Sequence, residues 1–175
     1  MFGPRKSTPM EILLVEDGLT DAKMTIFAIR RSGVHHRLSL VRTVADARRF
    51  LNREGVFSLA PPVNLLLLDM MLPDGSGLDL LHDLPGYPDD PDATATPSPS
   101  DITTVVLTAS DQPNLDAECR RAGASDFMRK PVKEDDFMRI VRDHKRWMID
   151  TEAPDIPLAP PPTPTRQPAA AAGPN

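Results

Sequence analysis

The segment from Leu65 to Gly77, Leu-Leu-Leu-Leu-Asp-Met-Met-Leu-Pro-Asp-Gly-Ser-Gly, constrains the fold of this chain more than any other. Four leucines are followed by a carboxylate, Asp69, and then by proline and glycines that favour a turn. A strand that is apolar on both faces is typical of a parallel sheet covered by helices. Such sheets bind ligands at the carboxyl ends of their strands, so Asp69 is predicted to lie where chemistry takes place.

Five apolar segments alternate with five segments of helical periodicity, which predicts a doubly wound α/β fold. The expected strands cover residues 10–15, 38–42, 64–68, 103–107 and 125–128, and the expected helices cover residues 18–33, 43–55, 77–84, 113–122 and 133–149. Right-handed crossovers would make the strands parallel, in the order 2-1-3-4-5. The switch point then falls between the first and third strands.

Proline divides the chain into a folded unit and other segments. Thirteen of the 20 prolines fall in two stretches of the sequence. Proline is excluded from helix interiors and central strands. We therefore expect a flexible N-terminus at 1–9, a folded domain at 10–150 with a proline-rich loop inserted at 85–101, and a disordered proline- and alanine-rich tail at 151–175.

Composition argues against several classes of function. The net charge of -5 argues against nucleic acid as the main partner. No apolar run approaches the roughly 20 residues that span a bilayer, and the N-terminus lacks the apolar core of a signal peptide. We therefore expect a cytoplasmic protein that binds neither DNA nor membranes. Cys119 is the only cysteine, so an intramolecular disulfide or a cysteine metal cluster is impossible.

Three carboxylates are predicted to meet at the switch point. Glu16 and Asp17 follow the first strand, and Asp69 follows the third. At about 4 Å and an effective dielectric of 20, each like-charge pair repels by about 4 kcal/mol, so a cation must lie among them. Hard carboxylate oxygens without nearby histidine or cysteine favour Mg²⁺. Lys130, after the fifth strand, and Thr108, after the fourth, add an ammonium group and a hydroxyl suited to phosphate.

As a set, these residues resemble the receiver domain of response regulators in two-component signalling. The acidic pair Glu16-Asp17, the Asp69 segment, the step Thr108-Ala109-Ser110 and the pair Lys130-Pro131 match the motifs of that family in order and spacing. The match covers about residues 10–149. The resemblance implies a flavodoxin-like receiver fold in which Asp69 takes a phosphoryl group from a phosphohistidine on a sensor histidine kinase.

The resemblance also implies how a metal ion and a lysine would assist. Asp17, Asp69 and the main-chain carbonyl of Met71 would ligate Mg²⁺, with Glu16 acting chiefly through a bound water. Lys130 would pair with Asp69 before transfer and with the phosphoryl oxygens after it. These roles agree with the physics of phosphoryl transfer, which needs an in-line nucleophile and neutralisation of the charge on oxygen.

The resemblance implies roles for two further pairs of residues. Thr108 would move to hydrogen-bond the phosphoryl group, and Phe127, three residues before Lys130, would be the aromatic switch residue. Met71 and Ser110 occupy positions that influence the access of the hydrolytic water. Because Met71 is bulky and cannot orient water, we expect slow self-dephosphorylation.

The finer sequence pattern is similar to that of single-domain response regulators that accompany bacterial phytochromes. It includes Glu-Asp-Gly-Leu-Thr-Asp-Ala from residue 16 and Phe-Leu-Asn-Arg-Glu-Gly from residue 50. The similarity implies a red/far-red light-sensing histidine kinase as partner, acting as phosphodonor or as phosphatase. Since only a proline-rich tail follows the last helix, we expect output by binding, and a homodimer through the face formed by helix 113–122, strand 125–128 and helix 133–149.

Two other functions stay open. A Mg²⁺-dependent phosphohydrolase of the haloacid-dehalogenase type also has a nucleophilic aspartate after a strand, but Asp69-Met70-Met71 lacks the second acid of its Asp-x-Asp motif. An adaptor with a receiver fold that works without phosphorylation is the stronger alternative, because an intact site need not be used. The response-regulator interpretation predicts no enzyme activity beyond the protein's own phosphorylation and dephosphorylation.

Overall fold

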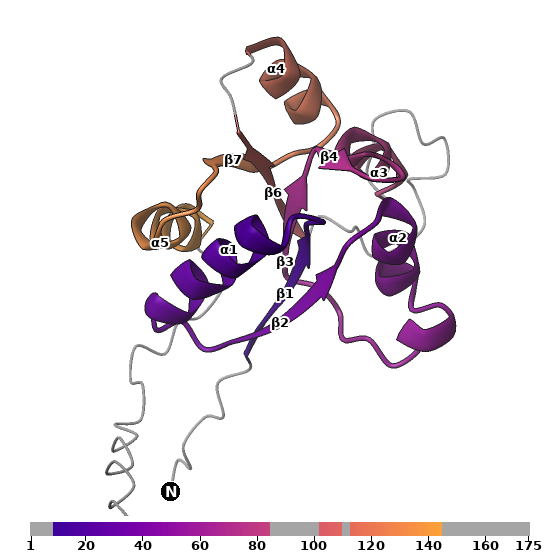
Figure 1. The fold of residues 1–175 in the computed structure, drawn as a ribbon, viewed down its shortest axis with the longest axis horizontal. Coiled ribbons are helices and arrows are strands. Elements are labelled where there is room, and N and C mark those ends of the chain that lie inside the picture. Colours follow the sequence, from indigo (N-terminus) through magenta and orange to yellow (C-terminus); the bar gives the residue numbers. More distant parts are fainter. Residues whose placement is uncertain (1–8, 85–101, 110–112, 145–175) are drawn as a thin grey trace, which may run out of the picture.

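A five-stranded parallel sheet forms the centre of the computed structural model, which describes residues 9–84, 102–109 and 113–144 (Figure 1). The strands run in the order β2-β1-β3-β6-β7. Their bounds are β1 Met10–Val15, β2 His36–Val41, β3 Leu65–Asp69, β6 Thr103–Thr108 and β7 Asp126–Arg129. The helices are α1 Leu19–Arg31, α2 Val44–Asn52, α3 Gly77–Asp83, α4 Pro113–Arg121 and α5 Glu134–Asp143, with a 3-10 turn at Gly55–Phe57. The predicted fold class and strand order are confirmed.

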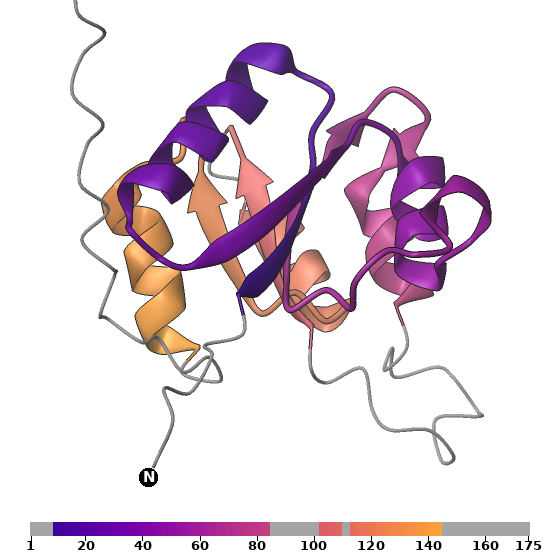
Figure 2. The same cartoon turned by 90° about the horizontal axis from the view of Figure 1, so that it is seen from below.

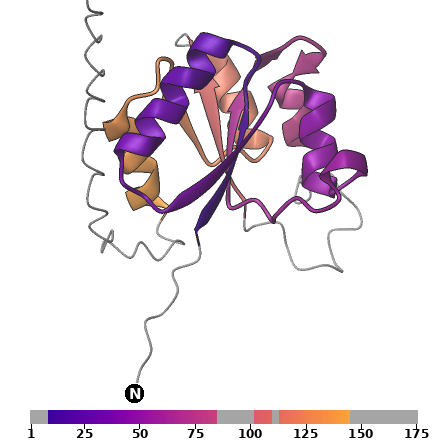
Figure 3. The same ribbon diagram turned by 60° about the horizontal axis from the view of Figure 1, so that its bottom comes forward.

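Helices cover both faces of the sheet, and each face has its own core. Helices α1 and α5 lie on one side of the strands, and α2 and α3 lie on the other (Figures 2 and 3). Along β3, Leu65 and Leu67 pack with α1 and α5, whereas Leu66 and Leu68 pack with α2, α3 and α4. All four side chains are fully buried, as expected for a central parallel strand.

Some boundaries differ from the sequence expectations. Strand β2 begins at His36 instead of Leu38, because its parallel pairing with β1 already starts with Met10 opposite His36. The described part of α5 ends at Asp143, and residues 145–149 of the expected helix lie outside the described residues. The expected N-terminal segment, proline-rich loop and C-terminal tail lie largely outside them too. None of the described helices is long and apolar enough to cross a membrane.

The chain folds into an unpredicted hairpin directly after Asp69. Its strands are β4 (Met71–Leu72) and β5 (Gly75–Ser76), which pair antiparallel. The amide of Gly77 then donates to the carbonyl of Met70 at 3.1 Å. A Cβ atom at Gly77 would collide with the carbonyl oxygen of Asp69. Glycine is therefore needed here for the chain to return against the strand that carries Asp69.

Asp74, at the tip of this hairpin, caps the start of α2. Its carboxylate accepts the amides of Val44 at 2.8 Å and Ala45 at 2.9 Å, while the hydroxyl of Thr43 accepts the amide of Asp46 at 3.0 Å. The first amides of a helix have no partner within the helix, so a distant carboxylate can satisfy them. These hydrogen bonds, led by the one from Ala45, lower the pKa of Asp74. The hairpin and α2 are thereby joined.

Candidate functional site

The candidate site is a pocket of about 490 Å³ at the carboxyl ends of the strands. Its lining contains six of the residues expected from the sequence: Glu16, Asp17, Asp69, Met71, Thr108 and Lys130. Of the other two expected residues, one is absent from this lining and the other is not described. Phe127 lies on β7 beside the pocket, and Ser110 lies outside the described residues.

Lys130 is the cationic centre of the pocket. Its ammonium nitrogen lies 2.6 Å from Glu16 Oε2, 2.8 Å from Asp69 Oδ2 and 3.5 Å from Asp21 Oδ2. The backbone amide of Lys130 donates to the carbonyl of Thr108 at 2.8 Å, which continues the pairing of β6 and β7 past the end of the strands. The edge of the sheet therefore positions the lysine over Asp69.

The carboxylate of Glu16 is almost completely buried, with 1% of the side chain exposed. One oxygen accepts the amide of Gly18 at 3.0 Å. The other oxygen accepts no hydrogen bond of ordinary geometry from the described residues, and its compensation is the ion pair with Lys130. Burial and the neighbouring charge of Asp69 outweigh Lys130 and raise the pKa of Glu16.

Lys130 itself is held in the charged form. Burial favours the neutral amine, but the contacts with Asp69 and Glu16 outweigh burial and raise the pKa of Lys130. A buried ammonium group between two carboxylates is stabilised by attraction in a region of low dielectric. The site therefore carries one positive charge that is not titrated near neutral pH.

The acidic residues fit a hard divalent cation. Glu16, Asp17 and Asp69 each offer a carboxylate oxygen, and these oxygens all lie within 4.8 Å of one another. Oxygen donors alone suit Mg²⁺, Ca²⁺ or Mn²⁺ rather than zinc. Three carboxylates against one lysine leave an excess of negative charge that a cation would offset. The residues present therefore fit the metal that the sequence predicted.

The backbone after Asp69 is also close to this cluster. The amide of Met71 donates to Asp69 Oδ1 at 3.2 Å, so the hairpin restrains the acceptor carboxylate from one side. The side chain of Met71 is 82% exposed, which leaves it at the rim of the pocket instead of in the core.

The two expected switch residues lie on neighbouring strands. Thr108 is the last residue of β6 and pairs in register with Arg129 of β7. Phe127 is half-buried against the core beneath α2, α3 and α4. The guanidinium of Arg120, on α4, lies 4.8 Å from the centre of the Phe127 ring, within the range of a cation–π interaction. The aromatic ring is therefore in contact with α4 and not with the pocket.

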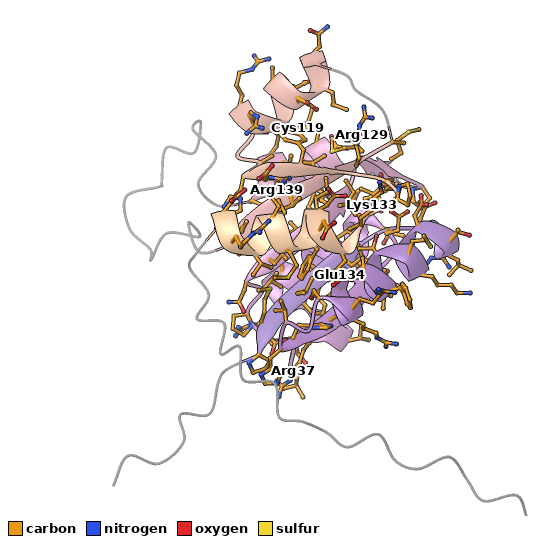
Figure 4. The ribbon with its side chains drawn as sticks, turned by 90° about the vertical axis from the view of Figure 1, so that its left-hand side faces the viewer. Arg37, Cys119, Arg129, Lys133, Glu134 and Arg139 are labelled. Carbon is orange, nitrogen blue, oxygen red and sulfur yellow. The ribbon has the colours of Figure 1, made fainter. Side chains whose placement is uncertain are left out.

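Charges on the expected dimer face have partners within the chain. Arg139 of α5 contacts Asp126 at 2.8 Å and Asp143 at 3.6 Å. Glu134, near the other end of α5, contacts Arg31 of α1 at 3.1 Å, and Figure 4 shows Glu134 and Arg139 on the same helix. Burial opposes the ionised form of Asp126, but hydrogen bonds from Arg139 and from the Phe127 amide lower its pKa.

The sequence analysis missed two residues that the structure connects to the site. The sequence analysis gave Asp21 no role in the site, yet it lines the pocket and contacts Lys130. A signal was available, since the first turn of a helix that follows a site strand lies beside the site. Asp74 was given no separate role, and no sequence pattern indicated that it caps a helix 30 residues earlier.

Comparison with known proteins places this arrangement in a family. Residues 12–142 match the family model described as the response regulator receiver domain. The response regulator Rcp1 of Synechocystis sp. is 35% identical over 81 residues, which are 46% of this chain and 55% of that protein. The aligned segment thus spans about half the length of that relative.

Solved structures agree with the sequence matches. The structure named bacteriophytochrome response regulator RtBRR has a TM-score of 0.69 at 29% identity, covering 84% of each chain. The structure described as the Mn²⁺-bound form of response regulator Rcp1 has a TM-score of 0.60 at 26% identity, covering 83% of this chain and 98% of the other. Both proteins are named as response regulators.

Proposed function

The chain belongs to the response-regulator receiver family of two-component systems, and on this premise we propose that Asp69 accepts a phosphoryl group from a sensor histidine kinase. A carboxylate oxygen of Asp69 would form the new bond to phosphorus. The bond between phosphorus and the histidine nitrogen of the kinase would break, and its electron pair would stay on that nitrogen. The product would be an aspartyl phosphate, which acts as a signal.

The observation that carries this proposal is the contact of Lys130 with Asp69. The ammonium nitrogen lies 2.8 Å from the carboxylate in a pocket that also holds Glu16 and Asp17. A transferred phosphoryl group spreads negative charge over its oxygens, and catalysis consists mainly of positioning and charge stabilisation. A rigid strand end that holds both the nucleophile and the cation supports that chemistry.

The metal in this proposal is Mg²⁺. Asp17, Asp69 and the main-chain carbonyl of Met71 would hold it, with Glu16 acting chiefly through a water. When bound, Mg²⁺ supplies positive charge to the phosphoryl oxygens. The Mn²⁺-bound form of the related Rcp1 supports a divalent metal in this family. Lys130 would exchange its contact with Asp69 for contacts with the phosphoryl oxygens.

Signal output in this proposal is a change of surface on the side of β6, β7 and α4. Thr108 would hydrogen-bond the phosphoryl group, and Phe127 would change its packing. An added charge can shift a surface between two arrangements when residues next to the charge link it to that surface. Because Arg120 contacts the Phe127 ring, a movement of the ring would be transmitted to α4.

We propose a bacterial phytochrome as the kinase, acting as phosphodonor or phosphatase. The likeness to RtBRR, which is named as a bacteriophytochrome response regulator, supports this partner. The homodimer through α4, β7 and α5 also remains a proposal. The pairing of Arg139 with Asp126 inside one chain means that contacts between copies would have to add to, or replace, existing ion pairs.

The lifetime of the phosphoryl group is proposed to be long. Met71 is at the rim of the pocket and has no polar group that could orient a hydrolytic water. Ser110, the second position proposed to influence water, lies outside the described residues. Replacing Met71 by Gln or Asn is expected to shorten the lifetime of the aspartyl phosphate, measured by the decay of the phosphorylated mass.

The test of the function is phosphorylation of the full chain by the autophosphorylated kinase in the presence of Mg²⁺. Intact mass should increase by one phosphoryl group in the wild type and not in Asp69→Asn. A wild type without the added mass would contradict the proposal and favour an adaptor that works without phosphorylation. An Asp69→Asn variant that gains the mass would contradict the choice of Asp69.

A further inference from the structure

We infer that Asp21 is a positioning residue that holds the ammonium group of Lys130 at the mouth of the pocket during phosphoryl transfer, an inference that rests on the proposed function. Asp21 Oδ2 lies 3.5 Å from Lys130 Nζ. It is the third carboxylate around that nitrogen, after Glu16 and Asp69. An ammonium group has three donors, so each carboxylate can be matched by one of them.

Asp21 differs chemically from the other two partners of Lys130. Glu16 and Asp69 belong to the group of carboxylates whose oxygens gather within 4.8 Å, and Asp21 does not. A divalent cation in that group would take up the charge of Glu16 and Asp69. The phosphoryl group would then occupy Asp69. Among the carboxylates that contact Lys130 in the described residues, Asp21 is the one that neither event engages.

Exposure places Asp21 on the open side of the pocket. Its side chain is 44% exposed, against 11% for Lys130 and 1% for Glu16. Of the three carboxylates that contact the ammonium group, Asp21 is therefore the most exposed to solvent. The lysine side chain is long and can adopt many rotamers. A partner that stays in contact with it during the reaction restricts these rotamers beforehand, so less conformational entropy is lost when Lys130 binds the phosphoryl oxygens.

A purely structural role for Asp21 makes different predictions. Asp21 lies in the first turn of α1, where a negative charge interacts favourably with the helix dipole. Such a role would alter stability and leave the phosphorylation rate unchanged. Asp46 provides the matched control, because it lies in the first turn of α2, contacts Arg49 at 3.5 Å and is absent from the pocket lining.

The experiment measures phosphorylation of the full chain by acetyl phosphate with saturating Mg²⁺, followed by intact mass. Asp21→Ala is expected to lower the maximal rate by roughly two- to five-fold, the range for a half-exposed ion pair. The Mg²⁺ concentration that gives half the maximal rate should change less than the rate itself. Asp21→Glu, which keeps the charge, should recover most of the rate, and Asp46→Ala should retain the wild-type rate.

Combining Asp21→Ala with Lys130→Ala tests whether Asp21 acts through the lysine. A double-mutant cycle isolates the coupling between two residues. Asp21→Ala should cause no further loss of rate once Lys130 is absent, and thermal unfolding checks that each variant is folded. Equal rates for wild type and Asp21→Ala, or an equal loss with and without Lys130, would overturn the inference alone. A wild type that is not phosphorylated by acetyl phosphate or by the kinase would overturn the proposed function together with this inference.

Discussion

Two ion-pair clusters adjoin strand β7, and they shift the pKa of a carboxyl group in opposite directions. At its carboxyl end, Lys130 contacts Glu16, and burial nonetheless raises the pKa of that carboxyl. Alongside the strand, Arg139 contacts Asp126, and its hydrogen bonds outweigh burial and lower the pKa of that carboxyl. Arg139 also donates to the carbonyl of Phe127 at 2.9 Å, so it ties α5 to β7.

The difference between the clusters is the balance of charge. Around Lys130, four carboxylates line one pocket, and two of them are buried. Around Asp126, the partners are the guanidinium of Arg139, the amide of Phe127 and the ring of His144 at 3.5 Å, and Arg139 is 40% exposed. An excess of buried negative charge is costly for stability and attracts cations. The first cluster thus has the charge balance that the proposed cation site needs, and the second joins α5 to β7.

The largest expected effect is the loss of stability when Lys130 is replaced, and the matching replacement of Arg139 should have a much smaller effect. Lys130→Met leaves Glu16 and Asp69 buried without their partner, and we expect a loss of about 3 kcal/mol in the free energy of unfolding without metal. Arg139→Met should cost less than about 1 kcal/mol, because the pair is partly exposed. Urea unfolding at pH 7 measures both. Equal losses for the two variants would contradict the proposed difference between the clusters.

The next effect concerns metal binding. A Mg²⁺ concentration 100 times the dissociation constant stabilises a protein by about 2.7 kcal/mol. We expect the wild type and Asp126→Asn to show this gain in thermal unfolding, and Glu16→Gln to show clearly less. An Asp126→Asn variant that loses the Mg²⁺ effect, or a Glu16→Gln variant that keeps all of it, would show that the acidic pocket is not the metal site.

The pH dependence of Glu16 can be measured with the same variant. Its folded pKa is raised above the ordinary value of 4.5, so ionisation disfavours the folded state. In the metal-free protein, the cost of ionising buried Glu16 does not affect stability below pH 4.5. It reduces the free energy of unfolding more and more as the pH rises, and reaches its full size above the folded pKa. Metal-free Glu16→Gln should therefore unfold at a higher temperature than wild type at pH 7, and this advantage should disappear in acid.

Asp74 is a third kind of carboxylate, compensated by backbone amides instead of by a cation. Asp74→Ala should cost about 1 kcal/mol, since it leaves two amides at the start of α2 without their acceptor. The gain in stability from Mg²⁺ should be retained. Asp46→Ala, which removes a carboxylate from the same helix turn without removing a cap, should cost less in urea unfolding. A loss in Asp46→Ala as large as in Asp74→Ala would contradict the capping role.

The smallest expected effect is the pH dependence of Asp126. The pKa of Asp126 in the folded protein lies below the ordinary value of 3.8. Ionised Asp126 therefore stabilises the folded state above pH 3.8, and this stabilisation is lost as the pH falls through the folded pKa. Asp126→Asn should therefore be less stable than wild type by at most about 1 kcal/mol at pH 7. The difference should vanish at the acid end of a pH series of urea unfolding. A difference between the two proteins that stays unchanged when the pH falls far below 3.8 would contradict the assigned ion pair.

The sequence predicted most of the fold and the residues of the pocket for physical reasons. The apolar run ending in Asp69 required a central parallel strand, and polar residues after other strands had to meet it at one edge. Glu16, Asp17, Thr108 and Lys130 are accordingly found in the same pocket.

The features that the sequence did not predict depend on tertiary contacts, which no local sequence pattern specifies. Asp21 and Asp74 each look like ordinary helix-start or turn residues, and only their tertiary partners reveal more. The start of β2 at His36 is set by pairing with β1, because its own alternation begins equally well at Leu38. Charged residues of α5, which belongs to the expected dimer face, have partners within the chain.

The contact between Asp74 and the start of α2 also offers a spectroscopic probe. The amide protons of Val44 and Ala45 are hydrogen-bonded to a carboxylate that belongs to the hairpin following Asp69. In an amide NMR spectrum, their chemical shifts and exchange with solvent should therefore report on this hairpin, although both residues lie on a different segment of the chain. Two backbone signals from α2 should thus change when the hairpin that follows Asp69 moves, without any label in the pocket.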